Sequence, residues 1–174
     1  MKNISELIKI RKSFAEASIK NKYDLSTVLV GLYADDSHFV YEILQNAEDC
    51  GATEISFELK DDQLIIKHNG KPFNEDDIET ITAIALKDND KRDQLDKIGK
   101  FGIGFKSVYA ITSTPRIQSG IYDFIITQFV LPDKFSDNNS FTETIITLPF
   151  DHIQTPPPEI FDMILKKFES FEVY

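Results

Sequence analysis

Three glycines lie close together near the middle of the chain, in Lys97-Ile98-Gly99-Lys100-Phe101-Gly102-Ile103-Gly104-Phe105-Lys106-Ser107. Glycine lets the backbone approach a ligand closely, and the start of a helix offers unpaired N–H groups to an anion. An apolar, helix-like stretch from Phe105 to Ile111 follows directly. The segment is therefore a candidate phosphate cradle, although taken alone it is equally typical of a tight strand-to-helix turn.

Two well-known phosphate motifs do not fit this segment. A P-loop requires Gly-x-x-x-x-Gly-Lys-[Ser/Thr], but Phe105 separates Gly104 from Lys106. A dinucleotide fingerprint requires Gly-x-Gly-x-x-Gly after the first strand of a βαβ unit, whereas the order here is Gly-x-x-Gly-x-Gly and no βαβ pattern precedes it.

A second set of polar residues falls on one face of a predicted helix. Asp35-Asp36-Ser37 is a helix-start signal, and the helix runs from His38 to Asp49, where Cys50-Gly51 ends it with a left-handed cap. Glu42, Asn46 and Asp49 are spaced i, i+4, i+7 and share one stripe. A carboxylate can hold an attacking water and an amide oxygen can bind Mg²⁺, but the pattern alone favours a solvated helix face.

The elements around these residues predict a mixed architecture. We expect a helix over 3–20, a hairpin of 54–59 and 64–68, and a helix that starts at Asn74 and continues to Leu86. Strands follow at 116–118, 122–131 and 142–148, with 132–140 as a loop, and Pro156-Pro157-Pro158 is a spacer before a helix near 159–171. This order predicts an α+β two-layer sandwich, a mainly antiparallel mixed sheet with helices on one face.

Composition limits the function classes. The 174 residues suffice for a core without metal or disulfide staples, and no apolar run reaches the length of a membrane helix. The single cysteine and the lack of a signal peptide predict a cytoplasmic protein. A net charge of −10 argues against nucleic acid as a ligand of this domain, since binding phosphates needs a basic face.

Three motifs occur in a fixed order: Glu42-x-x-x-Asn46-x-x-Asp49, then His68-Asn69-Gly70-x-x-Phe73, then Ile98-Gly99-x-x-Gly102-x-Gly104-Phe105. Together they resemble the GHKL superfamily (gyrase, Hsp90, histidine kinase, MutL), in particular its Hsp90-like branch, which includes sacsin-type domains. The resemblance covers roughly residues 30–150 and implies the Bergerat sandwich, with ATP and Mg²⁺ as cofactors.

The resemblance implies a role for several residues. Glu42 corresponds to the general base, Asn46 to the Mg²⁺ ligand, and Asp49 to an aspartate near the nucleotide. Gly70 would allow close approach to the base, and Cys50 and Phe73 would line its pocket. The remaining implied nucleotide-binding residues are Asn69, Gly99, Lys100, Phe101, Gly102, Ile103, Gly104, Phe105 and Thr144, with Thr142 an alternative to Thr144 and Lys106 an alternative to Lys100 as a source of charge.

His68 departs from the Hsp90-like pattern, which has aspartate at this place as the acceptor for the adenine amino group. A neutral imidazole can also accept through one nitrogen, so adenine remains compatible. A strand-end histidine bound to backbone is the structural alternative.

The implied organisation is an N-terminal helical segment (1–36), an ATP-binding domain (37–150, with a lid at 87–98) and a C-terminal spacer and helix (151–174) leading to further domains. The expected function is that of a slow Mg²⁺-dependent ATPase acting as a conformational switch, with a homodimer or a following transducer domain as partner. The alternatives are a nucleotide-binding scaffold without hydrolysis and, less favoured because Glu42 is present, a histidine-kinase catalytic domain.

Overall fold

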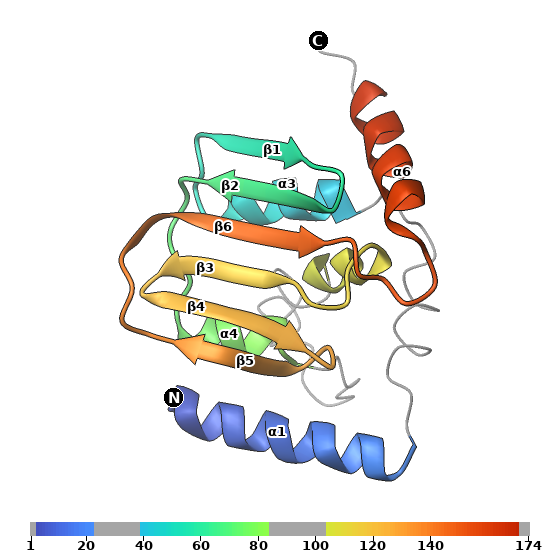
Figure 1. Cartoon of the computed structure of the whole chain (residues 1–174). Coiled ribbons are helices and arrows are strands. Elements are labelled where there is room, and N and C mark those ends of the chain that lie inside the picture. The colour runs from blue at the N-terminus through green and yellow to red at the C-terminus, as the bar shows by residue number, and fades with distance from the viewer. Residues whose placement is uncertain (1–2, 23–38, 84–103, 171–174) are drawn as a thin grey trace, which may run out of the picture.

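The structure is a computed structural model, and it describes residues 3–22, 39–83 and 104–170. A six-stranded sheet in the order β1-β2-β6-β3-β4-β5 forms one layer, and α3 and α4 lie on one of its faces (Figure 1). Every strand pairing is antiparallel. The predicted α+β two-layer sandwich is confirmed, with an antiparallel rather than a mixed sheet.

The strands alternate between a buried and a more exposed face, as the period of two along a strand requires. In β2, Leu64, Ile66 and His68 are buried, and across the ladder they pair with Leu148, Ile146 and Thr144 of β6. The strand bounds are Ile55–Leu59 (β1), Gln63–His68 (β2), Arg116–Gly120 (β3), Tyr122–Thr127 (β4), Leu131–Ser136 (β5) and Phe141–Pro149 (β6).

The helices begin where side chains can bind their free N–H groups. Asn3 caps α1 (Ile4–Lys20), and Asn74 with Asp77 forms a capping box on α4 (Glu75–Ile81). Phe39–Asp49 forms α3, and Lys106–Ala110 forms the short 3₁₀ helix η2. Pro157–Glu169 forms α6, which starts on prolines because the first helical position needs no N–H donor.

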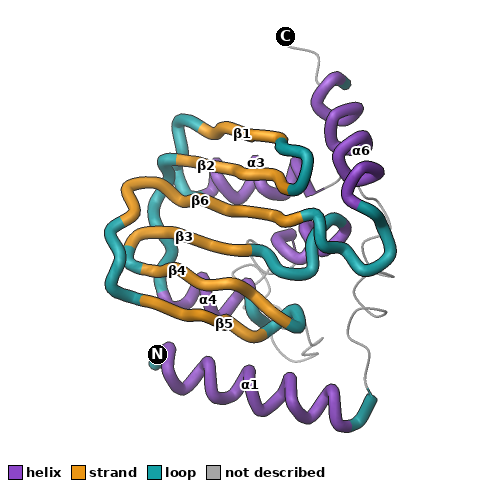
Figure 2. The backbone as a smooth tube through the Cα atoms, in the orientation of Figure 1, coloured by secondary structure: helices purple, strands orange, loops and turns teal. Residues whose placement is uncertain are grey.

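One hydrophobic core joins the sheet to the helices at both edges. It includes Ile4 and Leu7 of α1 and Ile160 and Ile164 of α6, beside the residues of α3 and the central strands. α1 runs beside β5, while α6 contacts β1 at the other edge of the sheet (Figure 2). Within the described residues, no helix is long and apolar enough to cross a membrane.

Several sequence predictions of local structure are wrong. Residues 132–140 are not all loop, because Leu131–Ser136 forms β5 and Gln128 and Phe129 make the preceding turn with positive φ. The helix that starts after Asn74 ends at Ile81, before the predicted end. Pro157 and Pro158 belong to α6 and not to a spacer. The helix expected over 3–20 is present as α1, but its apolar residues Phe14 and Ile19 are 41% and 62% exposed.

Candidate functional site

α3 presents its two faces to different surroundings. Phe39, Val40, Ile43 and Ala47 are buried in the core, and Gly51 ends the helix at φ +73°, as predicted for a left-handed cap. Glu42 and Asn46 are partly buried on the neighbouring stripe. Asp49, third in the predicted stripe, is exposed at the C-terminal end of the helix.

Glu42 lies against the last glycine of the Gly-rich segment. A Cβ on Gly104 would overlap the Glu42 carboxylate, with Cδ of Glu42 3.2 Å away. Residues 42 and 104 come together because η2, which follows Gly104, packs on α3. The structure therefore places the candidate general base and the end of the candidate phosphate cradle side by side.

A small cavity of about 10 Å³, the space of roughly one water, lies next to this contact. Side chains from α3, β2, α4, β6 and the start of η2 surround it. Five of the predicted site residues line it: Asn46, Cys50, His68, Phe73 and Phe105. Its remaining walls are the core side chains Ile43, Ile81 and Ile146.

His68 ends β2 and is 4% exposed. Its Nδ1 accepts a hydrogen bond from the Gly70 N–H at 3.2 Å. Burial lowers the pKa of the imidazole, and the nearby Glu143 carboxylate partly opposes this effect. The ring is thus kept in its neutral form near pH 7.

Behind His68, a chain of buried hydrogen bonds links three elements. Thr144 is the cross-strand partner of His68 and is 1% exposed, whereas its alternative, Thr142, is exposed. The hydroxyls of Thr144 and Ser119 are 2.6 Å apart, and the Phe73 N–H donates to Ser119 Oγ at 3.0 Å. Ser119 was not predicted from the sequence, since nothing in an ordinary strand serine signals this contact.

Gly70 and Asn69 turn the chain after β2. A Cβ on Gly70 would lie 2.9 Å from Cys50 Cβ and 3.1 Å from His68 Nδ1, so the close approach predicted for this glycine is to protein atoms. Asn69 Oδ1 accepts from the Thr53 and Glu54 N–H groups, and Nδ2 donates to Thr53 Oγ1. The Asn69 amide therefore holds the turn before β1.

Lys106 has a structural role. Its Nζ donates to the Phe129 carbonyl at 2.6 Å, and the residue is 4% exposed. Burial, and to a smaller extent the charge of Arg11, lowers its pKa to about 7. Lys106 is therefore held away from a phosphate role. Lys100, like Gly99, Phe101, Gly102, Ile103 and the predicted lid at 87–98, lies outside the described residues.

The residues around the cavity could supply only part of the coordination of a Mg²⁺ ion. Among the residues described, no three His, Cys, Asp or Glu side chains cluster as a metal site would require. Mg²⁺ usually keeps several waters and takes one or two protein oxygens together with substrate phosphates. Asn46, which lines the cavity one helical turn after Glu42, can supply one such oxygen.

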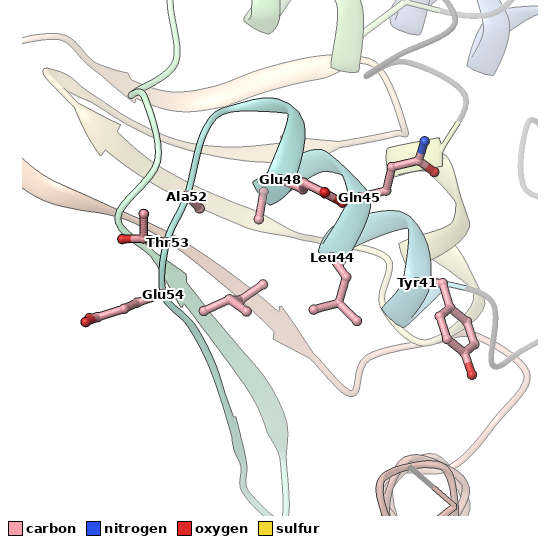
Figure 3. Close-up of a pocket in the computed structure, with 9 residues that line it drawn as sticks. Tyr41, Leu44, Gln45, Glu48, Ala52, Thr53 and Glu54 are labelled. Atoms are coloured by element: carbon pink, nitrogen blue, oxygen red, sulfur yellow. The ribbon is translucent and has the colours of Figure 1, made fainter. Parts of the chain in front are cut away.

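A larger groove of about 580 Å³ lies on the other side of α3, between this helix and the edge of β1 (Figure 3). Its side chains include Tyr41, Gln45 and Glu48 of α3 and Thr53 and Glu54 before β1. None of the predicted site residues lines it. This groove provides matched control positions on the same helix.

Comparisons with known proteins point in one direction. A family model described as the Sacsin domain matches residues 58–133. Human sacsin is 37% identical over 106 residues, which is 50% of this chain and 2% of sacsin. The Arabidopsis thaliana protein NO VEIN is 33% identical over 98 residues, 53% of this chain and 4% of that protein. The chain is therefore similar to these proteins over about half of its length.

Two further similarities are to a putative restriction enzyme and to a DNA repair protein. A putative type II restriction enzyme, HgiDII of Herpetosiphon aurantiacus, is 26% identical over 51% of this chain and 15% of its own length. The crystal structure of the N-terminal domain of a DNA repair protein superposes with a TM-score of 0.50 at 14% identity, covering 93% of this chain and 46% of that one. The chain thus spans 2% to 15% of the length of these curated relatives, and the solved structure supports the fold alone.

Proposed function

We propose that this sacsin-like chain is a Mg²⁺-dependent ATP-binding domain of the GHKL type, whose slow hydrolysis serves a conformational switch. The observation that carries the proposal is the contact between the Glu42 carboxylate and Gly104. It joins two motifs that are 62 residues apart in the sequence (104 − 42) beside a cavity lined by Asn46, His68 and Phe105.

In this proposal Glu42 is the general base. Its carboxylate takes a proton from a water whose oxygen attacks the γ-phosphorus, and the bond from that phosphorus to the bridging oxygen of ADP breaks. Bound Mg²⁺, with Asn46 as its protein ligand, would neutralise phosphate charge. Backbone N–H groups of the Gly-rich segment would bind phosphate oxygens.

Calorimetric titration of ATP with and without Mg²⁺ tests binding. Asn46→Ala should weaken Mg²⁺-ATP binding by about tenfold. Gln45→Ala is the matched control, because Gln45 is the preceding residue of α3 and lines the other groove. Equal affinities of Asn46→Ala and wild type would contradict the assignment of Asn46.

Phosphate release tests hydrolysis. Glu42→Ala should lower kcat by about 100-fold or more while leaving ATP affinity within about threefold. Glu48→Ala, which removes an exposed carboxylate from the same helix, should leave both unchanged. If Glu42→Ala hydrolyses ATP as fast as wild type, Glu42 is not the base.

A nucleotide-binding module without hydrolysis is the second candidate. The observation that favours it is His68 in the place where the Hsp90-like pattern has aspartate. Under this alternative ATP binds, no phosphate is released above background, and Glu42→Ala changes nothing.

The proposed partner is a second copy of the chain or a following transducer domain, which would supply a cationic side chain to the γ-phosphate. The net charge of −10 does not favour DNA or RNA as the ligand of this domain.

A further inference from the structure

The hydrogen bond at His68 fixes which ring nitrogen carries the proton. Nδ1 accepts from the Gly70 N–H, so it cannot itself be protonated. In a neutral imidazole the proton then lies on Nε2. Gly70 packs closely against Nδ1, because a Cβ on Gly70 would lie 3.1 Å from this nitrogen.

The other ring nitrogen is the one left for a ligand. Among the residues that the structure describes, the one hydrogen bond of the His68 ring is the bond that Nδ1 accepts, so Nε2 is not used by it. His68 lines the cavity together with Asn46, Phe73 and Phe105. A histidine in this state offers a ligand a hydrogen-bond donor, whereas an ionised aspartate offers only acceptors.

We propose that His68 recognises adenine by donating Nε2–H to the ring nitrogen N1, and not by accepting from the 6-amino group. The inference rests on the proposed function and specifies how its site selects the base. N1 of adenine is an acceptor, but N1 of hypoxanthine and guanine carries a hydrogen. The site therefore selects adenine through N1, and the 6-amino group contributes little at His68.

Four triphosphates separate the two ways of reading the base, each titrated calorimetrically into the full chain with Mg²⁺. Purine riboside triphosphate keeps N1 but lacks the amino group, and it should bind within about threefold of ATP. 1-Deaza-ATP keeps the amino group but lacks N1, and ITP carries a hydrogen on N1. Both should bind about tenfold more weakly, because a buried donor loses its partner.

The reverse ranking would overturn the inference: 1-deaza-ATP equal to ATP with purine riboside triphosphate weaker, or ITP tighter than ATP. Equal binding of all four would overturn it as well but leave the proposed function intact. Absence of binding by all four would remove the proposed function and the inference together.

Two further measurements concern His68 directly. In a long-range ¹H–¹⁵N spectrum, His68 should show the Nε2–H tautomer, and a protonated Nδ1 would contradict the proposal. His68→Asp should reverse the ranking of purine riboside triphosphate and 1-deaza-ATP, because the carboxylate can accept from the amino group. If the buried aspartate prevents folding, His68→Asn replaces it in this comparison. The asparagine amide can both donate and accept, so His68→Asn should bind the two analogues with similar affinity. A ranking unchanged from that of the wild type would overturn the proposal.

Discussion

The Glu42 carboxylate of α3 occupies the space into which a Cβ on Gly104 would project. This carboxylate is the far end of a flexible side chain. A methyl group at position 104 would therefore displace the carboxylate and not the backbone. The identity of residue 104 therefore controls where the candidate base lies. A substitution at position 104 should therefore move the carboxylate without lowering the stability of the fold.

Gly104→Ala should keep the fold but impair hydrolysis. Gly104 begins a helical segment without a positive φ, where alanine is more favourable than glycine by up to about 1 kcal/mol. A displacement of the carboxylate of about 1 Å is expected to lower kcat by about 100-fold. Urea unfolding and phosphate release measure the two effects. Wild-type kcat in Gly104→Ala would show that the contact does not position the base.

Gly70→Ala should destabilise the protein. Its Cβ would lie 2.9 Å from Cys50 Cβ and 3.2 Å from Ala52 Cβ, and neither atom can move without its backbone. Overpacking of this kind costs about 1–3 kcal/mol in the free energy of unfolding, measured in urea. Gly51→Asn is the control, because no atom lies within 4 Å of a Cβ there and asparagine tolerates φ +73°. A smaller loss in Gly70→Ala than in this control would contradict the close packing.

Ser119→Ala should also lower stability, through the loss of a hydrogen bond and not of volume. The buried Phe73 N–H would lose its acceptor, at a cost of about 1–3 kcal/mol. Thr144→Val removes the other hydroxyl of the pair at nearly constant shape. A double-mutant cycle should give a coupling of about 0.5 kcal/mol or more between the two positions. Additive effects would mean that the 2.6 Å contact contributes nothing.

The sequence predicted the parts of this site that depend on local periodicity. The stripe of Glu42 and Asn46 follows from the helical repeat of α3, and the His68 strand end follows from alternation in β2. β5 was not predicted, because the turn before it contains no glycine. Gln128 and Phe129 adopt positive φ in this turn. β5 pairs with β4 across this turn as the second strand of a hairpin.

Buried polar contacts were the least predictable feature. Lys106 looks like a phosphate-binding lysine because it lies two residues after Gly104, yet its ammonium binds the Phe129 carbonyl in the turn between β4 and β5. Ser119 has no distinguishing pattern, but its hydroxyl links Phe73 to Thr144. These contacts join groups that lie 23 to 46 residues apart in the sequence, so a local pattern does not reveal them.

Lys106→Met should change how stability depends on pH. The pKa of Lys106 is about 7 in the folded chain and about 10.5 when unfolded, so between these values the unfolded chain binds more protons. The free energy of unfolding of the wild type should therefore rise from pH 7 to pH 10 relative to Lys106→Met, by up to about 1.4 kcal/mol per pH unit. Below pH 7 the difference should level off, because both states are then protonated. Urea unfolding at pH 6, 7, 8, 9 and 10 measures this, with Lys166→Met, an exposed lysine of α6, as the control. Parallel curves for wild type and Lys106→Met would mean that the lysine stays charged in the fold, with its ammonium stabilised by the Phe129 carbonyl.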